Sequence, residues 1–251
     1  MRLLLLLTLV LCLSKPVSTQ TSSVIWQVTS FDINANVQQA ERALNVVATI
    51  NVTNVGNGPG RTLTVRLNSK ASVKSVTVNG AAAGFRPAPE TRADFQRVEI
   101  SLPASVAANG SVSAAVTYVL PVESNTGTMA ISPIATHFLP SSFWYPMPNT
   151  PFSVRGADTA PFRLSVNLPN VVSAGVEKGG PSGAAFDQTL HGQPFFIQGD
   201  WDRVEGAGEG KGISVLLEKG AAAEDRKRAD ALIAFTAAAR AFYAAALGPA
   251  P

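Results

Sequence analysis

The sequence is poor in the residues from which enzyme sites are usually built. Of its 251 residues one is a cysteine, Cys12, and two are histidines, His137 and His191. Neither histidine belongs to an H-E-x-x-H motif, which places two zinc-binding imidazoles on one helix face. No G-x-S-x-G motif, the nucleophile turn of many serine hydrolases, occurs either. We therefore assign no catalytic residue and no metal ligand. A site of two histidines and a carboxylate remains the alternative to a structural role for each histidine.

Charged residues are also scarce, at 15% of the chain, whereas hydrophobic residues make up 46%. This composition excludes a disordered chain and can fill the core of one large domain or two small ones. The formal net charge is +3, but Arg2 and Lys15 lie in an N-terminal segment of distinct character. Without them 18 basic residues face 17 acidic ones. We therefore expect no nucleic-acid partner.

The first 20 residues have the layout of a secretory signal peptide. A basic start at Arg2 precedes an apolar run over residues 3–13 and a polar stretch with small residues before Gln20. The apolar run is shorter than the roughly 20 residues that span a bilayer. The sequence thus predicts a signal peptide over residues 1–20 and an exported protein, which is periplasmic, extracellular or at the cell surface. A membrane association is expected only if this segment stays uncleaved as an anchor.

Cys12 lies inside this predicted leader. Lipidation of Cys12 is disfavoured because Leu11 occupies the preceding position, where a small residue is needed. Once the leader is removed the chain has no thiol, so it has neither disulfides nor cysteine metal ligands. Its stability must come from an apolar core.

Most of the remaining chain alternates between apolar and polar residues with a period of two. Successive side chains of a strand point to opposite faces, so each run predicts a strand with one buried face. This is typical of antiparallel sheets. We predict a mainly β fold, an antiparallel β-sandwich over residues 21–221 with one C-terminal α-helix. The clearest alternating runs are residues 44–53, 62–68, 97–102, 111–120 and 162–168, with further strands at 195–198 and 213–217.

Three Asn-Gly pairs separate predicted strands, at Asn57-Gly58, Asn79-Gly80 and Asn109-Gly110. Asparagine and glycine accept the positive φ angles of tight hairpin turns, so we predict such a turn at each pair. The glycine-rich residues 206–212 predict a flexible turn.

Residues 121–161 contain seven prolines, which prevent long strands, and several aromatic residues. We predict an ordered loop laid over the sheets. Its aromatic cluster Phe143, Trp144 and Tyr145 is the candidate surface site, because exposed aromatic side chains can stack on sugars or peptides. The alternative is that these three side chains are buried and anchor the loop.

From residue 222 onward the pattern becomes helical. Glu224 and Asp225 suit a helix N-terminus, and Gly248-Pro249 predicts its end. Apolar residues recur at helical spacing. This apolar face either folds back on the sheets or contacts a part of the protein that is not in the chain. The residues concerned are Leu232, Phe235, Ala239, Phe242 and Ala246.

Asp200 and Asp202 are two residues apart and could face the same way, as acid–base catalysis or calcium binding requires. The simpler interpretation is a pair of solvated turn carboxylates. A hydrolase that uses only these two groups is the least favoured function.

Five segments in a fixed order resemble the N-terminal domain of the zinc aminopeptidases of the gluzincin clan. They are residues 31–37 with 44–54, 73–80, 162–175, 195–200 and 241–251. The resemblance covers the chain from about residue 24 to its last residue. It implies a saddle-like β-sandwich, and it implies that residues 222–251 open a thermolysin-like catalytic domain cut off before its zinc motif.

Under this resemblance the chain is a non-catalytic scaffold that supports its own missing catalytic domain and borders the cleft for a peptide substrate. Zinc is expected only in that missing domain. The family's R-x-x-F-P-C-x-D segment is replaced here by Phe143-Trp144-Tyr145-Pro146, closer to the divergent membrane-associated branch. No substrate-binding residue can therefore be assigned. The alternative function is a free-standing secreted module that binds carbohydrate or acts in adhesion.

Overall fold

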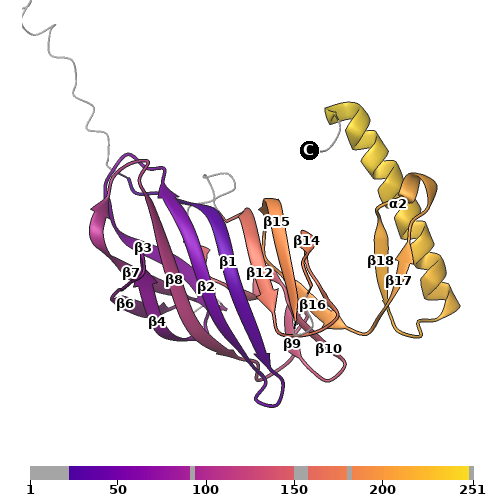
Figure 1. Ribbon diagram of the computed structural model, residues 1–251, viewed down its shortest axis with the longest axis horizontal. Helices are drawn as coiled ribbons and strands as arrows, with labels where there is room; N and C mark the ends of the chain where they lie inside the picture. Colours follow the sequence, from indigo (N-terminus) through magenta and orange to yellow (C-terminus); the bar gives the residue numbers. More distant parts are fainter. Residues whose placement is uncertain (1–22, 91–93, 150–157, 180–182, 249–251) are drawn as a thin grey trace, which may run out of the picture.

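The computed structural model describes residues 23–90, 94–149, 158–179 and 183–248. The predicted signal peptide and Cys12 lie outside these residues. One eight-stranded sheet is backed by two four-stranded sheets, and a hairpin with one long helix lies beside them (Figure 1). The predicted fold class, mainly β with a C-terminal helix, is confirmed.

The eight-stranded sheet has the order β14-β15-β12-β1-β2-β8-β4-β5. Its pairs are antiparallel except β1 and β12, which run parallel, with Phe31 opposite Phe162. The predicted antiparallel arrangement thus holds for this sheet apart from one pair, at which β12 joins β1 from a distant part of the chain. The strands are β1 (Trp26–Gln38), β2 (Ala43–Asn54), β4 (Ser72–Val78), β5 (Ala81–Ala82), β8 (Ser111–Pro121), β12 (Ala160–Val166), β14 (Val176–Glu177) and β15 (Ala184–Gly192).

The two four-stranded sheets have the orders β11-β3-β7-β6 and β13-β16-β10-β9. Figure 1 shows them behind the large sheet, the first beneath β2, β8 and β4 and the second beneath β12 and β15. The strands are β3 (Gly60–Asn68), β6 (Phe85–Pro89), β7 (Phe95–Val106), β9 (Met129–Ile131), β10 (Ala135–Phe138), β11 (Met147–Pro148), β13 (Val171–Val172) and β16 (Phe196–Gly199).

The core lies between these layers and is filled by the apolar members of the alternating runs. Leu44, Ile50 and Leu63 are fully buried. In β1 a bulge between Val28 and Ser30 shifts the register by one residue. Because a one-residue shift exchanges the two faces of a strand, the buried positions change from even to odd numbers along β1, and the apolar side chains stay in the core.

Only one of the three predicted Asn-Gly turns has positive φ at both residues. Asn79 (φ 50°) and Gly80 (φ 82°) join β4 to β5. At Asn109-Gly110 only the asparagine has positive φ, 62°. At Asn57-Gly58 neither residue has positive φ. Instead, the Asn57 side chain accepts a hydrogen bond from the backbone N–H of Ser23 at 2.7 Å. This pair therefore fixes the start of the described chain rather than closing a tight hairpin.

The prediction of a loop over residues 121–161 is wrong in part. The segment contains β9, β10, β11 and the 3-10 helix η1 (Pro140–Ser142). Two prolines are placed where they do not interrupt these elements: Pro133 falls between β9 and β10, and Pro140 opens η1, where no backbone N–H is required. Pro148 is the last residue of the two-residue strand β11. Residues 150–157 of this segment lie outside the described chain.

The C-terminal hairpin and helix form a unit of their own, which we call the hairpin–helix unit (residues 200–248). It consists of β17 (Trp201–Glu205), the 3-10 helix η2 (Gly208–Gly210), β18 (Ser214–Glu218) and α2 (Ala223–Leu247). Among the described residues, none after Phe196 belongs to the main core. The domain boundary predicted after residue 221 falls between β18 and α2, and these two elements pack on each other.

Candidate functional site

The predicted aromatic cluster lies in the core rather than on the surface. Trp144 and Tyr145 are fully buried, and Phe143 packs partly buried against the same core. The Trp144 ring meets Phe196 edge-on at 5.4 Å between centroids, and its indole N–H donates to the Pro194 carbonyl at 3.3 Å. These contacts anchor the segment between η1 and β11 and leave Trp144 no surface on which a ligand could stack.

Two tyrosine hydroxyls are buried beside this cluster, and their surroundings differ. Tyr118 donates its hydroxyl to the Trp144 carbonyl, whereas the hydroxyl of Tyr145 has no hydrogen-bond partner. Burial raises the pKa of Tyr118, and the nearby Tyr145 adds to the rise. Burial also raises the pKa of Tyr145, with the charge of Asp158 acting in the same direction. Neither hydroxyl is placed to act as an acid or base near neutral pH.

The Phe143 ring packs against the guanidinium of an arginine. The Arg66 guanidinium lies 5.7 Å from the centre of the Phe143 ring and 5.9 Å from that of Phe95. A cation over aromatic faces is attracted by the ring electrons.

The histidines and the aspartate pair do not converge on one site. His137 Nε2 contacts the Thr126 carbonyl, and His191 Nδ1 contacts the Thr159 carbonyl, each at 3.1 Å. Among the residues that the structure describes, no group of three or more potential metal ligands lies together.

Asp200 and Asp202 connect parts of the hairpin–helix unit. Asp200 pairs with Lys219 at 2.9 Å, and this hydrogen bond raises the pKa of the lysine. Asp202 pairs with Arg226 at the start of α2 at 2.5 Å and accepts the backbone N–H of Gly220 at 3.3 Å. Both carboxylates therefore bind the linker between β18 and α2.

One face of α2 is held by the hairpin. Its buried residues are Ala229, Ile233 and Ala237. A Cβ added at Gly206 or Gly210 would come within 2.8 or 2.7 Å of the Ile233 Cγ2 atom, so only glycine leaves room for this side chain. Arg240 donates to the backbone carbonyls of η2 and its neighbour, Glu209 at 2.5 Å and Lys211 at 3.1 Å.

The opposite face of α2 is apolar and mostly exposed, with Ala239 half-buried. Phe235 and Phe242 expose 72% and 68% of their surface, which is unusual for phenylalanine. We call this face the apolar stripe, and it is the candidate functional site. Sequence analysis identified its helical spacing, but not its exposure. It comprises Leu232, Phe235, Ala239, Phe242 and Ala246.

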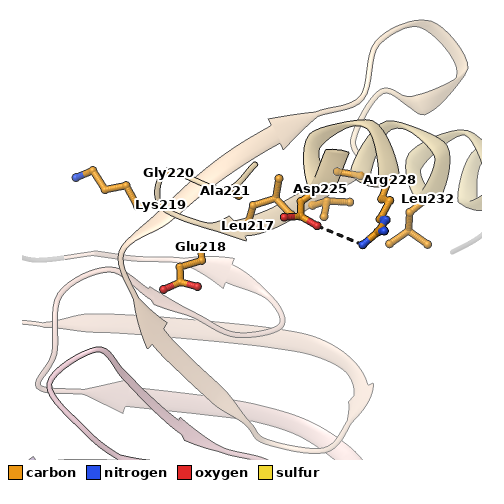
Figure 2. A pocket seen from close by; sticks show the side chains of 10 residues that line it. Leu217, Glu218, Lys219, Gly220, Ala221, Asp225, Arg228 and Leu232 are labelled. Carbon is orange, nitrogen blue, oxygen red and sulfur yellow. Dashed lines mark hydrogen bonds and ion pairs between the residues drawn. The ribbon is translucent and has the colours of Figure 1, made fainter. Parts of the chain in front are cut away.

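A groove between β18 and α2 borders the stripe (Figure 2). It holds about 670 Å³ and is open to solvent on one side. Leu217 and Ala229 are among its lining residues, and Leu232 belongs to both the groove and the stripe. Asp225 and Arg228 pair across one side of it at 3.4 Å.

By length and composition alone, α2 could cross a membrane, with a mean hydropathy of 1.3 over its most apolar 18 residues. In the structure it lies along the hairpin, held by Ile233 and Arg240. Length and hydropathy therefore do not by themselves assign its surroundings.

Comparison with known proteins identifies the fold. No family model and no curated protein matches the sequence. Among solved structures, leukotriene A4 hydrolase from Saccharomyces cerevisiae matches 86% of this chain with a TM-score of 0.62 and 17% identity. An M1 zinc metallopeptidase from Deinococcus radiodurans matches 92% of it with a TM-score of 0.61 and 17% identity.

The chain spans 36% of the length of the yeast protein and 55% of the bacterial one. At this identity the likeness establishes a shared fold. The fold agrees with the resemblance to the N-terminal domain of zinc aminopeptidases that the sequence motifs carry.

Proposed function

We propose that this chain is the non-catalytic N-terminal scaffold of a secreted zinc metallopeptidase, which supports the catalytic domain and borders its peptide cleft. The observation that carries the proposal is the shared fold with M1 zinc metallopeptidases over 86% or more of the chain. Zinc and the peptide would bind mainly to the catalytic part.

The hairpin–helix unit supports the same proposal. It is continuous with the sandwich, yet its apolar stripe faces solvent. A scaffold that ends in an incompletely covered unit is suited to join a following domain, because burial of apolar surface drives such association. The ion pairs of Asp200 and Asp202 fix the unit internally and leave its outer face free for that contact.

The proposal is tested by comparing two samples: residues 21–251 purified alone, and the protein as its own cells produce it. Aminoacyl anilides and short peptides are the substrates, with and without a zinc chelator. We expect no hydrolysis by residues 21–251 and chelator-sensitive hydrolysis by the cellular protein. Hydrolysis by residues 21–251, or an inactive cellular protein that contains nothing beyond them, would overturn the proposal.

Secretion is tested on the same cellular protein. N-terminal sequencing of the exported form should begin near residue 20, because the predicted leader is removed during export. Retention of the intact N-terminus in the cytoplasm would contradict this part of the proposal.

A further inference from the structure

The apolar stripe has the spacing of a coiled-coil seam. Its members follow one another by three, four, three and four residues, from Leu232 to Ala246. This repeat of seven places them along one edge of a helix, where a second helix can lie beside it at a shallow angle. A strand or an irregular loop has no matching period.

The stripe also alternates in size. Phe235 and Phe242 are large, whereas Ala239 and Ala246 are small, so each ring stands beside a hollow. Helices pack closely when the side chains of one enter the hollows of the other. The preferred interaxial angle for such packing is about 20°, at an axial distance of about 8–10 Å.

Beyond the Leu232 end, where Asp225 and Arg228 line the bordering groove, the surroundings of the stripe carry little charge. Between Ala231 and Leu247 the one charged residue is Arg240, and its guanidinium is hydrogen-bonded to hairpin carbonyls on the other side of α2. The lateral positions Ala234 and Ala241 are small. A partner surface must therefore be uncharged where it meets the stripe, because a charge there would lose water without gaining a counter-ion.

We propose that the stripe is covered by an apolar helix of the catalytic part, packed along α2 in the shallow-angle arrangement. This inference rests on the proposed function and specifies the secondary structure and chemistry of the contact. A bilayer fits less well. Arg226 and Arg240 bind both halves of α2 to the hairpin. If α2 entered a bilayer, the polar side chains of β17 and β18 would have to enter the lipid with the helix.

Four single-cysteine variants test the proposal in a background where Cys12, the one cysteine of these 251 residues, and any cysteine of the catalytic part are replaced by serine. Ala239→Cys and Ala246→Cys lie on the stripe, whereas Ala234→Cys and Ala241→Cys are matched controls on the lateral face. All four replace alanine, so their effects on folding are comparable. The reaction rate with a maleimide is measured in residues 21–251 and in the cellular protein.

In residues 21–251 we expect all four thiols to react readily, with Ala239→Cys slowed somewhat by its neighbours. In the cellular protein the two stripe thiols should react at least about tenfold more slowly, and the two lateral thiols should change by less than about twofold. This pattern of seven-residue protection is specific to a helix that lies along the stripe.

Other patterns overturn the proposal. Protection that appears in residues 21–251 only as their concentration rises would identify a second copy as the occupant. Protection of all four positions that depends on added phosphatidylglycerol vesicles would identify lipid. Reactive stripe thiols in a cellular protein that hydrolyses peptides would refute the helix contact while leaving the proposed function intact.

Discussion

The sandwich and the hairpin–helix unit use similar residues in opposite ways. In the sandwich the aromatic side chains Trp144 and Tyr145 are completely buried, whereas in α2 Phe235 and Phe242 are more than two-thirds exposed. Neither β17 nor β18 contains a fully buried residue. The first region completes its own core, and the second leaves much of its apolar surface uncovered. The difference indicates where folding stability resides and where association takes place.

The largest expected difference in stability lies between replacing a buried and an exposed aromatic residue by alanine. Trp144→Ala should lower the free energy of unfolding of residues 21–251 by about 3–5 kcal/mol, because it opens a cavity in the core. Phe235→Ala should change it by less than about 0.5 kcal/mol, because the ring is exposed. Urea denaturation followed by circular dichroism measures both. Equal losses would show that the two regions do not differ as described.

Amide hydrogen exchange of residues 21–251 should separate the regions next. We expect amides of α2 between Phe235 and Tyr243 to exchange on the order of a hundredfold faster than those of β2 and β8. Three buried residues hold the helix, and an isolated helix of this length is marginal in water. Equal protection in a monomeric sample would contradict this expectation and weaken the argument for a missing partner.

A smaller effect distinguishes satisfied from unsatisfied hydroxyls inside the sandwich. Tyr118→Phe removes a hydrogen bond to Trp144 and should cost about 1 kcal/mol. Tyr145→Phe removes a buried hydroxyl without a partner and should be neutral or stabilising. Each variant loses the same group and is the control for the other in thermal denaturation. A clear loss from Tyr145→Phe would reveal a partner for that hydroxyl.

The smallest effect concerns ion pairs on the surface. Lys178 and Arg163 lower the pKa of Asp187, so its contribution to stability is present above its unfolded pKa, about 3.9, and is lost as the pH falls through its folded pKa. The urea midpoints of wild type and Asp187→Asn should differ at pH 7 and converge near pH 3.

Asp202→Asn is the corresponding change in the hairpin–helix unit. It should leave the midpoint of the sandwich unchanged at either pH, since the Asp202 carboxylate is hydrogen-bonded to Gly220 and Arg226 within the hairpin–helix unit. Faster amide exchange should be confined to β17, β18 and α2. A shift of the sandwich midpoint would show that the two regions unfold together.

The sequence was sufficient for the alternating strands and for α2, because both patterns depend on near neighbours. Leu44–Val52 alternates without interruption, and the helix ends before Gly248 as predicted. The parallel pairing of β1 with β12 was not predictable, since it depends on which distant strands meet. The burial of Trp144 stayed open for the same reason: proline-rich segments have no period from which an inward face can be inferred.

The hairpin–helix unit was missed for a related reason. Residues 213–217 read as a strand, but nothing local shows whether that strand joins the sandwich or pairs with residues 201–205. The apolar spacing of α2 was recognised, yet the hairpin buries Ala229, Ile233 and Ala237 and leaves the predicted spacing outside. Two apolar faces on one helix cannot be ranked from sequence when one consists largely of alanine.

The fit of Ile233 against Gly206 and Gly210 has a further consequence for the evolution of this surface. Each residue advances a helix by about 100°, so moving the isoleucine by one position along α2 while it stayed packed on the glycines would turn Phe235 toward the hairpin and present a different side of α2 to the outside. Gly206 and Gly210, more than twenty residues before Ile233 in the sequence, thus determine which side of the helix faces outward.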